Sequence, residues 1–154
     1  MIDIYFFQEF PDVYRDRVTE LIREFELLLP MWVQRVEVRN QLEDHDAWAS
    51  MCLLQDYRHV KLYISSQLFE QTRDFQREAM LHEIAHCYNV QPTTVAREIL
   101  HLMIPNGEET EDPAAKQLYQ VLSERIRFAV ESANTDLTYS LLRYVEKLKG
   151  EASA

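Results

Sequence analysis

The pentapeptide His82-Glu83-Ile84-Ala85-His86 is the most informative stretch of this 154-residue chain. Its two histidines are four residues apart, so on an α-helix they lie on one face, one turn apart, and both imidazoles can bind a single cation. Glu83 is turned round the helix from this pair, and its carboxylate can instead reach a water held in an open position of the metal. The pattern H-E-x-x-H therefore predicts a metal-binding helix that carries its own proton acceptor.

The residues on either side of the pentapeptide have the pattern of a helix over about 67–89. Phe75 and Ala79 precede the histidines at helical spacing, so the two imidazoles continue an inward-facing stripe. Asn89 and Pro92 predict the end of this helix. A core helix with two hydrogen-bonded histidines is the alternative, but burying two imidazoles and a carboxylate costs free energy unless a partner compensates them. The pattern therefore favours a bound cation.

Length and composition predict one globular domain over residues 1–150, followed by a short tail at 151–154. The chain has 154 residues, of which 47% are hydrophobic, enough for a core of its own. Only two glycines are present, and neither Gly-rich phosphate-binding pattern occurs. The formal net charge of -10, without a basic patch, argues against nucleic acid as a partner and against binding to anionic membranes.

The same sequence bears on the cellular compartment. No apolar run approaches the length of a transmembrane helix, and the N-terminus has no basic region of the kind that opens a secretory signal. Cys52 and Cys87 are the only cysteines, too few for a disulfide framework. We therefore expect a reduced, cytoplasmic protein without a membrane partner.

Helical and alternating patterns together predict an α+β domain. Most of the predicted elements are bounded by prolines or by polar loops. In order, they are a helix at 11–29, a strand at 32–38, a polar loop at 40–46, a hairpin at 47–55 and 58–64, the motif helix, a short helix at 93–104, an acidic loop at 106–113 and a long helix at 113–148. The small sheet is expected to be antiparallel or mixed.

A catalytic zinc ion normally has three protein ligands and a water, so the two histidines require a third residue. The extended pattern H-E-x-x-H-x-x-G-x-x-H is absent, because Asn89 and Pro92 occupy the positions of its glycine and its last histidine. A carboxylate from a distant helix is the alternative. The candidates are Glu98, Glu124, Glu131 and Asp136, with His101 as a nitrogen ligand, whereas Glu108, Glu109 and Glu111 lie in an acidic loop that is less suited to hold a ligand rigidly.

Glu131 is the preferred third ligand. It lies in the middle of the last predicted helix, in the apolar neighbourhood 128–133, where a lone carboxylate calls for a partner. Glu124, two turns earlier on the same face, lies in a more polar stretch. Both glutamates lie opposite the main apolar stripe of this helix, which includes Ala133, so periodicity buries Glu131 only if the helix is sandwiched. Glu124 therefore stays open as an alternative.

Residues 47–142 resemble the zincin metallopeptidases, most closely the minimal gluzincins and the small zincin-like proteins of phages and prophages. The resemblance rests on the hairpin before Leu81-His82-Glu83-Ile84-Ala85-His86 and on a later helix with Glu131-Ser132-Ala133-Asn134-Thr135-Asp136-Leu137. It implies a zincin-like fold, Zn2+ held by His82, His86 and Glu131, and Glu83 as the catalytic glutamate. It also implies that the last strand before the motif helix, near 58–64, is a sheet edge that pairs with an extended peptide.

One position departs from this family. Larger gluzincins have an aspartate four residues after the ligand glutamate, where it supports a histidine ligand, and here that position is Thr135. Support for the histidines must therefore come from another residue.

The residues and the resemblance together predict a zinc-dependent metallopeptidase that hydrolyses a peptide or protein substrate. Glu83 is its expected general base and acid, acting on a metal-activated water. Three alternatives stay open: a metal-binding but inactive interaction module, a helical interaction protein without metal and, among peptidases, an enzyme that cleaves phage repressors. The candidate donors to a developing oxyanion are Tyr88, His101, Arg127 and Tyr139.

Overall fold

The computed structural model describes residues 1–40, 48–53 and 58–152. Its helices and strands confirm the predicted α+β class. Most of the predicted polar loop at 40–46 and the turn of the predicted hairpin lie outside the described residues. The elements are, in chain order, β1 (Asp3–Phe6), α1 (Asp12–Glu24), the 3-10 helix η1 (Glu26–Leu28), β2 (Arg35–Asn40), β3 (Ala49–Leu53), β4 (His59–Ile64), the 3-10 helix η2 (Ser66–Glu70), α2 (Arg73–Met103) and α3 (Pro113–Ala152).

The described strands form one mixed sheet in the order β1-β2-β4-β3. β1 and β2 are parallel, and so are β2 and β4, whereas β3 is antiparallel to β4. The pairing of β3 with β4 confirms the predicted hairpin, with Met51 opposite Leu62. The sequence prediction lacks β1, because four residues whose side chains alternate only between exposed and half-buried give a weak strand signal.

The expectation that the strand near 58–64 is a sheet edge is wrong. β4 has β2 on one side, with Val60 opposite Val36, and β3 on the other. A hairpin pattern specifies one neighbour of a strand and does not reveal a parallel partner from earlier in the chain. On this side of the sheet the edge is β3, which pairs only with β4 among the described strands.

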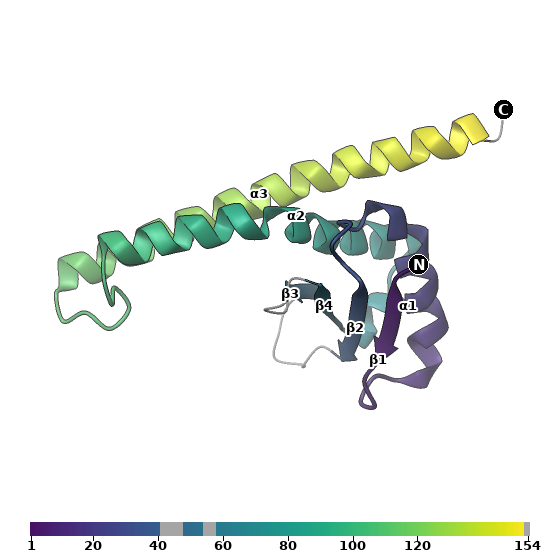
Figure 1. Ribbon diagram of the computed structural model, residues 1–154, viewed down its shortest axis with the longest axis horizontal. Helices are drawn as coiled ribbons and strands as arrows, with labels where there is room; N and C mark the ends of the chain where they lie inside the picture. Colours follow the sequence, from purple (N-terminus) through teal and green to yellow (C-terminus); the bar gives the residue numbers. More distant parts are fainter. Residues whose placement is uncertain (41–47, 54–57, 153–154) are drawn as a thin grey trace.

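The main core lies between the sheet and the helices α1 and α2. Buried residues of β2 and β4 alternate with half-buried ones, so one face of the sheet supplies the core. Figure 1 shows α1 beside the sheet, α2 passing across it and α3 running alongside α2. The buried core includes Val18, Leu21 and Ile22 of α1, Phe25 just after it, Val36 and Val38 of β2, Val60, Leu62 and Ile64 of β4, and Leu81 and Ile84 of α2.

The motif helix α2 is longer than the sequence predicts. It begins at Arg73, where the Thr72 hydroxyl accepts a hydrogen bond from the Phe75 N–H at 3.3 Å, and it runs for 31 residues. The predicted break at Pro92 is therefore wrong, because this proline lies inside the helix. Proline removes one helical hydrogen bond. On either side of Pro92, α2 contacts α3, through the hydrogen bond from Asn89 to Asn134 and through the packing of Leu100 against Tyr119.

A tight turn joins α2 to α3. Asn106 has a positive φ of 55°, and a Cβ added to Gly107 would clash with the ring of Tyr119. Asp112 then accepts a hydrogen bond from the Ala114 N–H at 2.9 Å, which caps the first turn of α3. The result is a long helical hairpin whose far end extends beyond the sheet (Figure 1).

Candidate metal centre

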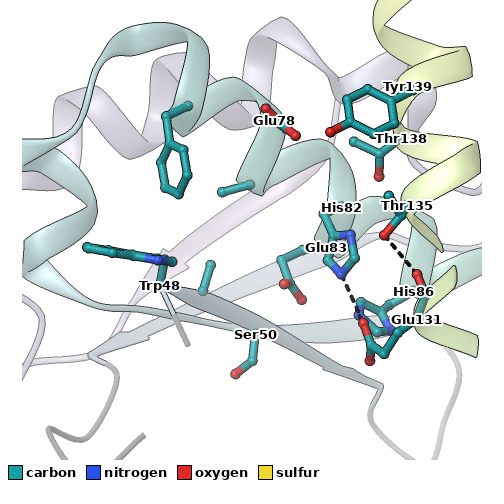
Figure 2. A pocket seen from close by; sticks show the side chains of 13 residues that line it. Trp48, Ser50, Glu78, His82, Glu83, His86, Glu131, Thr135, Thr138 and Tyr139 are labelled. Carbon is teal, nitrogen blue, oxygen red and sulfur yellow. Dashed lines mark hydrogen bonds and ion pairs between the residues drawn. The ribbon is translucent and has the colours of Figure 1, made fainter. Parts of the chain in front are cut away.

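The two histidines of the motif meet Glu131, which comes from α3. Nε2 of His82 lies 3.2 Å from Oε2 of Glu131, and Nε2 of His86 lies 3.7 Å from the same oxygen. One ligand atom from each of the three residues lies within 4.8 Å of the other two, close enough to bind a metal ion. Figure 2 shows the three side chains converging from the two helices.

This group is partly open to solvent. About a quarter of each histidine side chain is exposed, and half of the Glu131 side chain. Burial lowers the pKa of His86, with His82 acting in the same direction and Glu131 opposing it. A lowered pKa favours the neutral imidazole, which is the form that binds a cation. An exposed centre of this kind leaves room for a further ligand, unlike a closed structural site.

Glu83 lines the same cavity as these three residues. Its exposed fraction is only 6%, so its carboxylate lies at the inner wall rather than at the rim. In Figure 2 it lies beside His82, on the side of Ser50. This is the arrangement that the spacing of the motif predicts, with the glutamate next to the ligand face and separate from it.

His86 contacts a buried asparagine, Asn134, whose role the sequence patterns do not predict. Asn134 on α3 is fully buried, and its Nδ2 lies 2.7 Å from Nδ1 of His86. Its Oδ1 accepts a hydrogen bond of 2.6 Å from Nδ2 of Asn89. Only the spacing in the sequence indicates this contact: Asn134 follows Glu131 by three residues, so the two side chains lie on the same side of the helix. Thr135 donates instead to the backbone oxygen of Glu131 at 2.9 Å.

The cavity beside the histidines has a volume of about 500 Å³ and is bounded by three elements. Trp48 and Phe75 form an apolar wall, with their rings perpendicular and 5.6 Å apart. Ala49 and Ser50 bring the start of the edge strand β3 to the cavity. Thr138 and Tyr139 of α3 close the opposite side (Figure 2). The cavity therefore combines side chains that could hold a metal ion, an apolar wall and a strand edge.

The four candidate oxyanion donors are in different places. Tyr139 lines the cavity, and a hydrogen bond to Glu78 raises its pKa. Tyr88 donates its hydroxyl hydrogen to the backbone oxygen of Leu28 at 2.8 Å. His101 and Arg127 line a second cavity of about 420 Å³ between α2 and α3. Of the four, Tyr139 therefore lies where a donor to the metal-side cavity is needed.

The other candidate ligands lie away from the histidines. Glu124 lines the second cavity, and Glu108 accepts a hydrogen bond there from the Tyr119 hydroxyl. Within residues 1–40, 48–53 and 58–152, the group able to hold a metal consists of His82, His86 and Glu131. The remaining candidates, which this group does not include, are Glu98, His101, Glu109, Glu111 and Asp136.

Two further findings concern the chain as a whole. Among the described helices, none combines the length and the apolar character that crossing a membrane requires. Comparisons of the chain with protein-family models, with curated proteins and with solved structures gave no match.

Proposed function

We propose that this protein is a zinc-dependent metallopeptidase. One observation carries the proposal: Glu131, 49 residues after His82, places one carboxylate oxygen 3.2 Å and 3.7 Å from the two histidine Nε2 atoms. Two imidazoles and one carboxylate form the donor set of many catalytic zinc sites. The order of a β-hairpin, the motif helix and a later helix with the glutamate also supports a zincin-like arrangement.

The distances fit zinc. In a tetrahedral site with ligands about 2.0–2.1 Å from the ion, two ligand atoms are roughly 3.3–3.4 Å apart. The separations of 3.2 Å and 3.7 Å lie close to this value on either side. The ligand atoms of the two histidines lie within 4.8 Å of each other, so any approach of the imidazoles that the ion requires is smaller than about 1.5 Å. The open side of the group can take a water or a substrate oxygen.

The side chains around the ion have distinct roles in this proposal. A bound zinc would polarise a peptide carbonyl and acidify a water. Glu83, nearly buried beside His82, accepts the proton of that water and passes it to the leaving amine. Tyr139 lines the same cavity, and its hydroxyl can donate to negative charge on the substrate oxygen once it turns away from its hydrogen bond to Glu78.

The substrate would be an extended peptide with a large apolar side chain. The edge strand β3 offers backbone groups to which a peptide can pair as an added strand. The wall of Trp48 and Phe75 then meets a side chain of that peptide. Apolar contacts of this kind favour bulky side chains over small ones.

The test combines metal analysis with peptide cleavage. Protein purified without an affinity tag or added metal should contain about one zinc per chain. His82→Ala should lose this zinc, whereas Glu83→Gln should keep it. A peptide library should be cleaved by the parent protein and not by Glu83→Gln. Equal cleavage by the parent and by Glu83→Gln, or cleavage that survives removal of the metal by a chelator, contradicts the proposal.

A further inference from the structure

The far end of the helical hairpin has a small core of its own. We define the distal arm as residues 93–129, which include the ends of α2 and α3 that extend beyond the sheet (Figure 1). Its buried side chains are those of Leu100, Ile104 and Tyr119, and they form a cluster separate from the main core. The partly buried residues packed against this cluster are Ala115, Leu122 and Ile126. Two helices held together by so few buried side chains gain little from packing against each other alone.

The distal arm also carries an apolar surface that points away from this small core. The residues concerned recur at helical spacing on each helix and are about half exposed or more, up to 81% for Leu102 and 76% for Phe128. So many apolar side chains on one short hairpin are typical of an interaction surface. They are Val95, Ile99, Leu102 and Met103 on α2 and Leu118, Val121 and Phe128 on α3.

The charges of the distal arm are complementary to those of a second copy placed antiparallel to it. The tip carries Glu108, Glu109, Glu111 and Asp112, with Lys116 beyond them. The base carries three arginines and two glutamates, so its formal charge is positive, and all five residues are exposed. The tip is therefore negative and the base slightly positive, although the chain as a whole has a net charge of -10. The residues of the base are Arg97, Glu98, Glu124, Arg125 and Arg127.

The spacing of these charges places the apolar surface at the centre of such a pair. Asp112 and Arg125 are 13 residues apart on or beside α3, roughly 20 Å along a helix. A two-fold axis midway between them passes close to Leu118 and Val121, which are both exposed. The same patch then contacts itself, as an isologous interface requires.

We propose that the protein is a homodimer in which two distal arms pack antiparallel as a four-helix bundle. Each copy contributes its exposed apolar side chains to the bundle core, and the acidic tip of each arm lies against the arginines of the other. The interface is built from residues outside the metal centre, so it does not depend on bound zinc or on peptidase activity.

Sedimentation analysis of the full chain tests the proposal. The parent protein is expected to be a dimer at about 100 µM, a concentration at which a complex with a micromolar Kd is almost fully formed. Leu118→Glu/Val121→Glu should raise the dimer Kd at least about tenfold, because four glutamates would enter one apolar interface. The matched control is Val13→Glu/Leu27→Glu, two exposed apolar residues near α1, which should leave the dimer intact.

A charge exchange tests the antiparallel geometry. Arg125→Glu should weaken the dimer, and adding Glu109→Lys/Glu111→Lys in the same chain should restore it. Circular dichroism must show unchanged helix content in every variant, and His82→Ala should dimerise like the parent protein. A monomeric parent protein, a dimer indifferent to Leu118→Glu/Val121→Glu, or no restoration by the charge exchange overturns the proposal.

Discussion

Nδ1 of His86 on α2 lies 2.7 Å from Nδ2 of Asn134 on α3, so a fully buried amide fixes the orientation of the second motif histidine. An imidazole that binds a metal through Nε2 carries its proton on Nδ1 and needs an acceptor there. The amide of Asn134 can supply that acceptor by rotating its oxygen towards His86, with Asn89 turning to accept from the nitrogen. Metal binding is therefore expected to be linked to the orientation of this amide pair.

Substitutions at Asn134 test this link. Asn134→Leu should lower zinc affinity by about 10–100-fold, the usual cost of losing a partner that orients a ligand. Asn134→Asp keeps an acceptor for Nδ1 and should retain most of the affinity. Competition with a chromophoric chelator gives the affinities, and the exposed Ser132→Ala on the same helix serves as the control. Zinc affinity of Asn134→Leu equal to that of the parent protein would show that His86 needs no support from α3.

Glu131 and Glu124 can be told apart directly. Glu131→Gln should lower zinc affinity by more than about 100-fold, since it removes a ligand rather than its support. Glu124→Gln should leave the affinity unchanged, because Glu124 lines the second cavity and not the metal centre. Isothermal titration with zinc measures both. A larger loss in Glu124→Gln than in Glu131→Gln would reverse the assignment of the third ligand.

Zinc bound as proposed should stabilise the protein, because the three residues proposed to hold it come from α2 and α3 and lie together only in the folded chain. Free zinc at about 100 times its Kd should raise the free energy of unfolding by about 2.7 kcal/mol. The midpoint of chemical denaturation followed by circular dichroism measures this gain. The double variant His82→Ala/His86→Ala should show no gain, and an equal gain in that variant would place the bound zinc elsewhere.

Local patterns in the sequence predict the elements around the metal centre well. The period-2 alternation of the hairpin, the helical spacing around His82 and the Asp112-Pro113 start of the last helix all have local physical causes, and the structure has β3, β4, α2 and α3 there. The sheet edge and the continuity of α2 through Pro92 depend instead on contacts between distant segments. Periodicity within one segment carries no information about such contacts.

The face of α3 that contacts α2 is a further feature that local sequence patterns do not predict. The apolar stripe of this helix includes Ala133, which is exposed, whereas Asn134 and Thr138 are buried. Polar residues therefore line the contact between α3 and α2 beside the metal centre. Apolar periodicity consequently predicts the wrong face of α3 as the buried one. Glu131 is half exposed at the rim of the cavity rather than sandwiched between layers. Its closeness to the histidines follows from the pairing of the two helices, which the sequence does not specify.

Cys87 should be unreactive in the folded protein. It is nearly buried, and burial raises the pKa of its thiol to about 12, so almost no thiolate exists at pH 8. In a Cys52→Ser background, a thiol reagent at pH 8 should label it only after addition of denaturant. The unfolded chain loses this proton near its ordinary pKa while the folded chain keeps it, so this thiol should lower the free energy of unfolding as pH rises above about 9. Rapid labelling without denaturant would contradict the buried position.

The apolar wall beside the metal centre should set the substrate preference, if the proposed peptidase activity holds. Trp48→Ala removes one ring of the perpendicular pair with Phe75 and enlarges the cavity. The kcat/KM for a peptide with a large apolar side chain should fall by about 10–100-fold relative to the matching alanine peptide, because one apolar contact contributes about 1–3 kcal/mol. Tyr5→Ala, which changes a half-exposed aromatic residue on the far edge strand β1, is the control. An unchanged ratio in Trp48→Ala, with zinc content intact, would mean that the substrate side chain lies elsewhere.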